Sequence, residues 1–277
     1  MNMLWLNAAL SGIMEGITDF LPISSVGHLI LVRDLLPMNV SADPAQNRAF
    51  ADLFAVWIQL PAILAVLAIF RQRLWKEAVD VVHNEAAARR FWLGMLVAFL
   101  PVVIVGVLLH HPIEKYLFGP LPIACALFVG GVVILAVERW GKPGDVTRAE
   151  DLSYRHSIVI GLFQCLSLIP GTSRSASTIV GARVQGLNRS TAAEYSFFLG
   201  LPTLCAAGGY KLLGSIMKGD IDWSVAAAPL AIGSITSFVT ALLVVEWFMN
   251  YLRKRTLSVF GWYRIALAIV VVAVKTC

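Results

Sequence analysis

Charged side chains are scarce in this sequence. Asp, Glu, Lys and Arg together make up only 14% of its 277 residues, whereas 58% are hydrophobic. Soluble domains contain about 25% charged and about 45–50% apolar residues, so the deficit excludes an ordinary soluble domain and indicates several membrane spans. The net charge of +5 does not indicate a nucleic-acid partner, because the Lys and Arg residues gather in short loops, where they set membrane topology.

Cysteine is also scarce, and its spacing excludes a C-x-x-C metal or redox motif. The four cysteines are Cys125, Cys165, Cys205 and Cys277, of which three lie in apolar runs, so we expect free buried thiols rather than metal ligands or disulfides. No polar tail or linker is long enough for a second, soluble domain, so we expect a single integral membrane domain over residues 1–277. The N-terminus lacks a basic n-region, and we expect no cleaved signal peptide there.

What the sequence has in abundance is long apolar runs. We predict six full membrane spans, each of about the 17–25 residues that a bilayer core requires, at residues 50–70, 91–109, 121–138, 194–213, 224–248 and 260–275. Two other apolar segments, 4–37 and 156–188, are interrupted by proline and polar residues. Irregular backbone at membrane depth is tolerated inside protein or along a cavity. We therefore predict an all-α polytopic membrane protein with six transmembrane helices and two re-entrant helical hairpins.

The charge of the loops predicts the orientation. Lys and Arg concentrate in the loops 71–90, 139–155 and 249–259 and are sparse in the alternate loops. Because cytoplasmic loops carry the excess of positive charge, we expect these three loops in the cytoplasm and both termini outside.

The two halves of the sequence also resemble each other. Gly-Ile-Met-Glu at residues 12–15 matches Gly-Leu-Phe-Gln at 161–164, each followed by a proline and a serine-rich turn. Each half holds one broken hairpin and three spans, and since three is odd, the second half must run upside down. We predict inverted-topology repeats over about residues 1–138 and 156–277. Such repeats usually place a site near the midplane, where they meet.

The first broken segment carries an acidic pair. Glu15 and Asp19 are four residues apart, so a helix puts both carboxylates on one face. Two carboxylates in a low dielectric repel each other unless protons or a cation intervene. A divalent ion held by one or two carboxylates and by substrate phosphates is the usual Mg²⁺ arrangement, and Ca²⁺ accepts similar ligands. A proton-relay pair and a helix-end pair near the surface are the alternatives.

Serines and a histidine follow this acidic pair. Ser24 and Ser25 follow Pro22 and are placed to cap a restarting helix, whose N-terminal end favours an anion. Gly27 permits close approach of backbone or ligand. His28, three residues past Ser25, can share a helix face with that hydroxyl, an arrangement used for nucleophilic attack. The residues alone do not choose between Ser24 and Ser25, and a simple cap beside a satisfied histidine is the alternative.

The second broken segment carries the stronger signal, the run Pro-Gly-Thr-Ser-Arg-Ser at residues 170–175. The guanidinium of Arg174 can bind phosphate oxygens with two parallel hydrogen bonds and stays charged. An arginine this deep needs an anionic partner, and a snorkelling or internally paired arginine is the alternative. Gln164 occupies the repeat position of Glu15, where its amide can orient a ligand or water without adding charge.

Both clusters resemble the motifs of one family. The first is similar to E-G-x-T-E-F-L-P-x-S-S-x-G-H, and the second to P-G-x-S-R-S-G with an upstream Gln, of the bacterial undecaprenyl-diphosphate phosphatases, also called bacitracin resistance proteins. The likeness covers nearly the whole chain. It implies six spans and two re-entrant hairpins, hydrolysis of undecaprenyl diphosphate, recycling of the lipid carrier for peptidoglycan, bacitracin resistance and dependence on Mg²⁺ or Ca²⁺. It also implies the bacterial cytoplasmic (inner) membrane, with a site open to the periplasmic side.

The same resemblance implies roles for individual residues. It makes Glu15 and Asp19 the metal ligands, Ser25 the nucleophile, His28 its acid/base partner and Arg174 the phosphate clamp. Supporting contacts to substrate are expected from Ser24, Gly27, Gln164, Ser173 and Thr178. The sequence departs from the motifs at two positions. Asp19 stands where the family usually has Glu, which puts the ion preference in doubt, and Ala176 stands where it has Gly, which predicts a small change in packing.

Two other functions compete with this interpretation. A secondary transporter or lipid flippase would also place an anion site between inverted repeats, with Ser25 and His28 as phosphate ligands only. Ser25-Val-Gly27-His28 is also similar to the P-S-G-H motif of type 2 phosphatidic acid phosphatases, but no histidine follows Ser173-Arg174, where that class needs its nucleophile. The pairs Gly130-Gly131 and Gly208-Gly209 allow helices to pack within one chain or between two, so a homodimer stays open.

Overall fold

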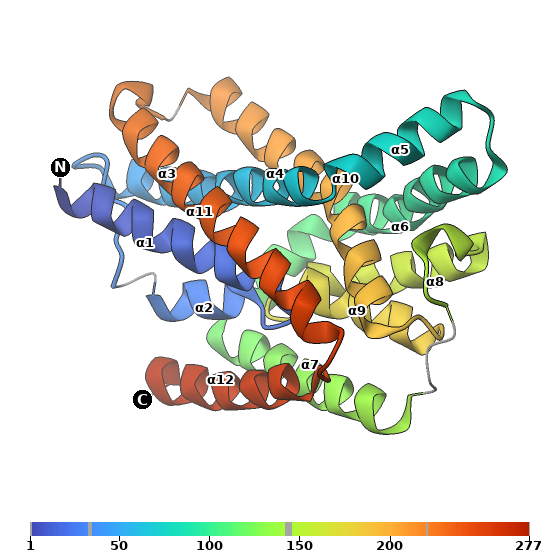
Figure 1. The fold of residues 1–277 in the computed structure, drawn as a ribbon. Helices are drawn as coiled ribbons and strands as arrows, with labels where there is room; N and C mark the ends of the chain where they lie inside the picture. Colours follow the sequence, from blue (N-terminus) through green and yellow to red (C-terminus); the bar gives the residue numbers. More distant parts are fainter. Residues whose placement is uncertain (1, 33–34, 142–145, 220, 277) are drawn as a thin grey trace.

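The computed structural model describes residues 2–32, 35–141, 146–219 and 221–276. Over these residues the chain is helical, and its extended pairing is limited to one bridge between Val146 and Leu187. The helices are α1 (Asn2–Thr18), α2 (Ser25–Val32), α3 (Pro44–Trp57), α4 (Gln59–Ile69), α5 (Arg71–Val82), α6 (Ala86–Leu117), α7 (Pro120–Trp140), η1 (Ala149–Asp151), α8 (Tyr154–Cys165), η2 (Leu166–Leu168), α9 (Arg174–Val184), α10 (Arg189–Lys218), α11 (Trp223–Leu252) and α12 (Ser258–Thr276) (Figure 1).

Six helical stretches are long and apolar enough to cross a membrane: Pro44–Val82, Ala86–Leu109, Pro120–Trp140, Arg189–Lys218, Trp223–Leu252 and Ser258–Lys275. Each predicted span lies inside one of them, so the six predicted spans are confirmed and the chain is a multi-pass membrane protein. The prediction of a loop from residue 71 was wrong, because α5 is helical over Arg71–Val82. Hydropathy marks where apolar residues end, whereas a helix continues into polar sequence that keeps one buried face, here Leu74 and Glu77.

Local sequence sets several of the helix starts. Asp43 caps α3 by accepting a hydrogen bond from the Ala45 amide at 2.9 Å, and proline occupies the first helical position. Asn188 caps α10 by accepting from the Thr191 amide at 2.8 Å. These side chains satisfy amide groups that the first helical turn leaves without backbone partners.

The two segments predicted to be broken are broken where expected. In the first, α1 ends at Thr18 and α2 begins at Ser25, with Pro22 in the turn between them. In the second, α8 ends at Cys165 and η2 at Leu168, and α9 begins at Arg174 after a Pro-Gly turn. Residues 33–34, near the end of the first segment, lie outside the described residues.

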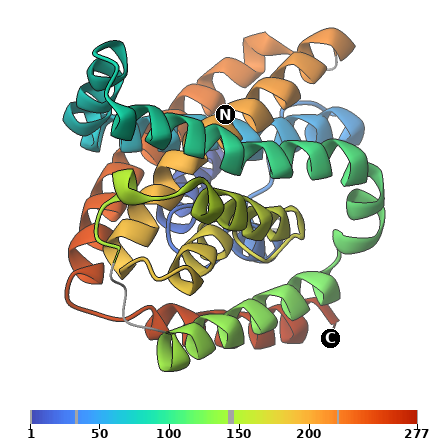
Figure 2. The ribbon, with the colours of Figure 1, turned by 90° about the vertical axis from the view of Figure 1, so that its right-hand side faces the viewer.

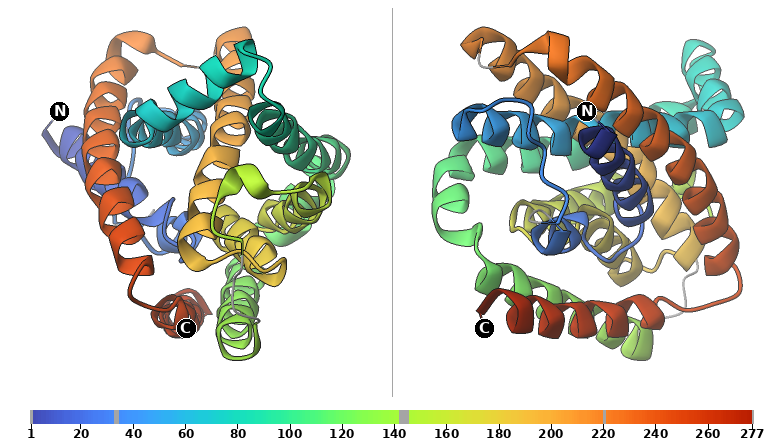
Figure 3. Two further views of the ribbon diagram at one scale, coloured as in Figure 1. Left: turned by 45° about the vertical axis from the view of Figure 1, so that its right-hand side comes forward. Right: turned by 90° about the vertical axis from the view of Figure 1, so that its left-hand side faces the viewer.

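The long helices surround these broken segments. In Figure 2, α8 and α9 lie in front, with α6 above them and the pair α7 and α12 below. The right panel of Figure 3 views the opposite side and has α1 and α2 in front. Helix α1 packs along α11, α8 packs along α6, and α7 packs along α12, which runs antiparallel to it. The two broken segments meet inside this surround, where the Ser175 hydroxyl of one donates to the Leu21 carbonyl oxygen of the other at 2.9 Å.

Equivalent features recur in the two broken segments. A Cβ atom on Gly12 would lie 2.5 Å from the Gly233 carbonyl oxygen of α11, and one on Gly161 would lie 2.4 Å from that of Ala98 in α6. Only glycine permits helix backbones to approach so closely. Ser24 and Ser173 both have a positive φ, of 73° and 72°, and each directly precedes a helix, α2 or α9. Each also follows its Glu or Gln partner, at 15 or 164, by nine residues.

Ion pairs gather where two of the predicted cytoplasmic loops meet. Arg73 pairs with Glu150 at 2.9 Å and also pairs with Glu194. Arg90 donates a hydrogen bond to the Glu150 carbonyl oxygen at 3.2 Å. The regions 71–90 and 139–155 therefore lie at the same end of the molecule, as their predicted location on one side of the membrane requires. Residues 142–145 of the second region lie outside the described residues.

Candidate functional site

An ion pair joins the two broken segments at their turns. Nη2 of Arg174, the first residue of α9, lies 3.2 Å from Oδ2 of Asp19, which directly follows α1, and each side chain is only 8% exposed. The sequence predicted that Arg174 needs an anionic partner. The structure shows the internal ion pair, which was the alternative to a bound phosphate. Because the pair brings together the two motifs from opposite halves of the chain, it defines the centre of the candidate site.

The surroundings of Arg174 are built to admit its guanidinium. Its Nη1 donates a hydrogen bond to the Ser196 carbonyl oxygen of α10 at 3.2 Å, and its guanidinium carbon lies 6.0 Å from the centre of the Phe20 ring. A Cβ on Gly200 would come within 2.6 Å of Nη1. Glycine at position 200 thus leaves room for the guanidinium against α10.

Three of the predicted site residues carry buried polar atoms that have no hydrogen-bond partner. Among the described residues they include both carboxylate oxygens of Glu15, Oε1 of Gln164 and Nε of Arg174. Glu15 is fully buried. The charged groups of Asp19 and Arg174 and the hydroxyl of Ser25 lie near enough to interact with its carboxylate. Buried polar groups in folded proteins are nearly always satisfied, so exceptions of this kind need an explanation such as a bound ion or ligand.

The acidic residues alone do not complete a metal site. In the part of the chain that the structure describes, no three His, Cys, Asp or Glu side chains are arranged to hold an ion. Glu15 contributes two oxygens without partners, and Asp19 contributes a carboxylate of which one oxygen contacts Arg174. This donor set fits a hard divalent cation whose remaining ligands come from phosphate oxygens and water.

Hydroxyl groups connect the two turns and line the start of α9. Ser175 donates to the Leu21 carbonyl oxygen at 2.9 Å, and so ties α9 to the first broken segment. Ser173 caps α9 by accepting from the Ala176 amide at 3.3 Å. The Thr178 hydroxyl lies 2.6 Å from the Ser196 hydroxyl. This contact braces α9 against α10. Of the predicted supporting residues, Ser173 therefore lies at the turn, whereas Thr178 braces the helix that carries Arg174.

His28 lies on α2, one turn after Ser25. Its Nδ1 is 2.7 Å from the Ser24 carbonyl oxygen, and its Nε2 is 2.7 Å from the Tyr263 hydroxyl. None of the hydrogen bonds found among the described residues joins His28 to Ser25. The predicted pairing of the serine hydroxyl with the imidazole thus stays a prediction, and Tyr263 is a contact that sequence reasoning missed.

Gly27 and Gln164 have structural neighbours of their own. A Cβ on Gly27 would lie 3.0 Å from a methyl group of Leu127 in α7, so glycine here lets α2 pack closely on α7. Gln164 donates through Nε2 to the Thr203 hydroxyl at 3.2 Å, which leaves its Oε1 as the atom without a partner. The predicted ligand role of Gln164 therefore depends on this oxygen.

Arg264 is a second buried arginine that sequence reasoning missed. It lies on α12 with no exposed surface, and its guanidinium donates to the carbonyl oxygens of Pro22 at 3.3 Å, Ala126 at 3.2 Å and Gly171 at 3.0 Å. One side chain thus holds the turns of both broken segments. An ionisable residue inside an apolar span is the signal that could have found it, but position 264 lies near the predicted start of the last span.

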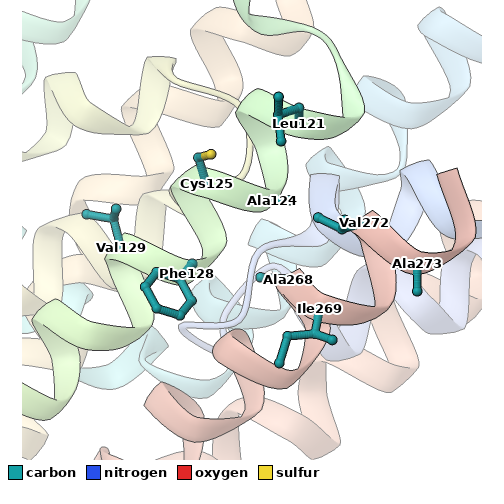
Figure 4. A pocket seen from close by; sticks show the side chains of 9 residues that line it. All are labelled: Leu121, Ala124, Cys125, Phe128, Val129, Ala268, Ile269, Val272 and Ala273. Carbon is teal, nitrogen blue, oxygen red and sulfur yellow. The ribbon is translucent and has the colours of Figure 1, made fainter. Parts of the chain in front are cut away.

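An apolar cavity of about 440 Å³ lies apart from these polar groups, between α7 and α12. Figure 4 shows its lining, which is Leu121, Ala124, Cys125, Phe128, Val129, Ala268, Ile269, Val272 and Ala273. No predicted site residue lines it, and its walls suit hydrocarbon rather than phosphate. The candidate site is therefore the polar region between the turns and not this cavity.

A family model, "Bacitracin resistance protein BacA", matches residues 8–270 of the chain. The chain belongs to the BacA family. Its relatives in this family include proteins named "Undecaprenyl-diphosphatase" from Nitrosospira multiformis, Psychrobacter sp. and Laribacter hongkongensis. They are 44%, 41% and 42% identical to it, over 97%, 98% and 95% of this chain and 94%, 95% and 92% of their own lengths. The resemblance stated from the two motifs is thereby confirmed.

Proposed function

We propose that this BacA-family protein hydrolyses undecaprenyl diphosphate to undecaprenyl phosphate and inorganic phosphate. This reaction recycles the lipid carrier for peptidoglycan synthesis, and by restoring free carrier it confers resistance to bacitracin. The observation that carries the proposal is the buried contact between Asp19 and Arg174, which joins the two motifs at one point. Relatives that align over nearly the whole chain are named as undecaprenyl-diphosphatases, and these names support the same substrate.

Glu15 and Asp19 are the proposed ligands of Mg²⁺ or Ca²⁺. The two unpartnered oxygens of Glu15 support this assignment, because a buried carboxylate without hydrogen bonds is compensated by a cation. The chemistry that such an ion supplies when bound is neutralisation of charge on the phosphate oxygens. Asp19 contacts Nη2 of Arg174, and we expect the guanidinium to bind phosphate oxygens of the substrate.

The proposed reaction uses Ser25 as the nucleophile. Its oxygen attacks the terminal phosphorus, the bond from that phosphorus to the bridging oxygen breaks, and undecaprenyl phosphate leaves. His28 takes the serine proton, and water then cleaves the phosphoserine to release phosphate and restore the hydroxyl. Arg174 stabilises the charge on the transferring group, which is the larger part of phosphoryl-transfer catalysis. Ser24, Ser173, Gly27, Gln164 and Thr178 are proposed to line or brace the substrate site. If His28 acts directly, Ser25 is a ligand donor only.

The two broken segments are proposed to be re-entrant hairpins of inverted-topology repeats. The glycine contacts of α1 with α11 and of α8 with α6, and the positive φ of Ser24 and Ser173, support a duplicated unit. The common end of regions 71–90 and 139–155 supports the loop-charge assignment. We propose that this end faces the cytoplasm and that the site of this inner-membrane protein opens to the periplasm.

The homodimer stays a prediction. Fewer of the four glycines that suggested it are free to contact a second chain. Cβ atoms on Gly130, Gly131 and Gly208 would all collide with atoms of this same chain, so these glycines serve packing within it. Gly209 has open space instead. Of the four glycines that suggested an interface, only this one is therefore free to meet a second copy.

Phosphate release from undecaprenyl diphosphate by the purified protein in detergent tests the proposed function. We expect one inorganic phosphate per lipid monophosphate formed, because the reaction breaks one phosphoanhydride bond. A transporter or flippase would release none under the same conditions. Ser25→Ala is expected to lower the rate at least about 100-fold if the serine is the nucleophile, whereas near-normal turnover of this variant would eliminate the serine mechanism and leave the enzyme assignment intact.

A further inference from the structure

Both ring nitrogens of His28 have defined partners. Nδ1 lies 2.7 Å from a carbonyl oxygen, that of Ser24. A carbonyl oxygen only accepts hydrogen bonds, so Nδ1 carries a hydrogen in this arrangement. In the neutral imidazole Nε2 is then the atom with a free lone pair, and the Tyr263 hydroxyl lies 2.7 Å from it. The nitrogen that exchanges protons is therefore the one that Tyr263 contacts.

The two rings are also stacked, with centroids 5.6 Å apart and planes 11° from parallel. Tyr263 contacts His28 from α12. The residue that follows Tyr263 is Arg264, which donates hydrogen bonds to the carbonyl oxygens of Pro22 and Gly171. The helix that carries Tyr263 is thus anchored to the same turn after which α2 begins. This anchoring fixes where the Tyr263 hydroxyl lies relative to the imidazole.

We propose that Tyr263 is the positioning residue for His28, an inference that rests on the proposed role of His28 in proton transfer. The Tyr263 hydroxyl donates a hydrogen bond to Nε2 when the ring is neutral. It must turn this hydrogen away from Nε2, or pass it to Nε2, for the ring to be protonated, and it then accepts a hydrogen bond from Nε2–H. It therefore holds the ring in one orientation in both states, while the Ser24 carbonyl oxygen keeps the hydrogen on Nδ1. A histidine partner that fixes tautomer and orientation in this way is what proton-transfer sites require.

Tyr263→Phe tests this role, because it keeps the ring and removes only the oxygen. We expect kcat for phosphate release to fall about 10–100-fold, with KM within about threefold of wild type, since substrate binding relies on other groups. Tyr251→Phe is the matched control. It removes a tyrosine hydroxyl whose hydrogen bond goes to the Thr256 carbonyl oxygen, outside the site, and it should retain wild-type kcat. Thermal unfolding of both variants shows whether either loses stability.

A double-mutant cycle separates positioning from a general structural effect. On the background of His28→Gln, Tyr263→Phe should cause no further loss, because a positioning residue acts only through the histidine. An equal further loss on that background, or wild-type kcat for Tyr263→Phe alone, would overturn the proposal. The wild-type assay distinguishes failure of the proposed role of Tyr263 from failure of the proposed phosphatase function. If the wild-type protein releases phosphate and the cycle is additive, only the role of Tyr263 fails, whereas no release by the wild type would remove the proposed function itself.

Discussion

Replacing Arg174 by lysine is expected to lower kcat/KM for phosphate release by about 100–1,000-fold, although the positive charge is kept. The guanidinium contacts Asp19 through Nη2 and the Ser196 carbonyl oxygen through Nη1, and its Nε has no partner among the described residues. A lysine ammonium group is a single point charge and cannot bind two phosphate oxygens side by side. Steady-state kinetics on undecaprenyl diphosphate measures the loss.

Three further variants separate the loss of phosphate binding from a loss of folding. Arg71→Lys changes an exposed arginine that contacts the Ala68 carbonyl oxygen, and it should retain wild-type kinetics. Gly200→Ala keeps the arginine at position 174 but displaces its side chain. The new methyl group would lie 2.6 Å from Nη1, so the flexible guanidinium must move. We expect about 10-fold or greater loss of activity from this shift. Gly209→Ala, on the same helix in open space, is its matched control. Wild-type activity of both Arg174→Lys and Gly200→Ala would show that Arg174 does not bind the phosphate.

Replacing Arg264 by methionine is expected to destabilise the fold and to abolish most of the activity together. The substitution leaves the buried carbonyl oxygens of Pro22 and Gly171 without their arginine donor, whereas that of Ala126 lies within α7 and keeps its helical hydrogen bond. Each buried acceptor that loses its partner costs about 1–3 kcal/mol, partly offset because an arginine charge is no longer buried. We expect a net loss of about 2–5 kcal/mol and at least about 100-fold lower kcat, because both turns that carry the site lose their common anchor.

Thermal unfolding in detergent and the phosphate-release assay measure the two effects on the same samples. Arg255→Met removes a positive charge from the exposed loop between α11 and α12, and it should change neither quantity. Full activity of Arg264→Met at a temperature where the variant is folded would contradict the anchoring role. Loss of activity without any loss of stability would instead indicate that Arg264 contacts the substrate.

Hydropathy was sufficient to predict the membrane spans but not the helix ends. The apolar runs had to be helical, because a spanning segment must satisfy its own backbone groups in lipid. The same runs did not reveal that α3, α4 and α5 follow one another through single residues, Ile58 and Phe70. That arrangement depends on packing against other helices, which a single sequence does not display.

The individual pieces of the site could be predicted because ionisable groups are rare in apolar segments. Glu15, Asp19 and Arg174 were found in this way, and the repeats predicted that the two clusters face each other. The pairing of Asp19 with Arg174 needed coordinates, because the two residues are 155 positions apart in the sequence. The same holds for Tyr263 and Arg264, whose contacts with the turns are set by how α12 packs against α2 and α7.

The choice between Ser24 and Ser25 also depends on backbone geometry. Ser24 has a positive φ of 73°, and its hydroxyl accepts from the Gly27 amide at 3.3 Å. Ser25 is the first residue of α2, and its hydroxyl lies near Glu15. Ser24 therefore shapes the turn, which supports the proposal of Ser25 as the nucleophile. A run of two serines gives no such distinction in the sequence, because either can cap a helix.

The central claim is that the acidic pair and Arg174 form one site for a phosphate and a divalent cation. Phosphate release should be measured with Mg²⁺ or Ca²⁺, after chelation and after the ion is added back, for wild type, Glu15→Gln and the exposed control Glu246→Gln. We predict at least about 100-fold loss on chelation, full recovery with the ion, a higher ion requirement for Glu15→Gln and wild-type behaviour for the control. An unchanged rate in chelator, with Glu15→Gln as active as wild type, would contradict the claim.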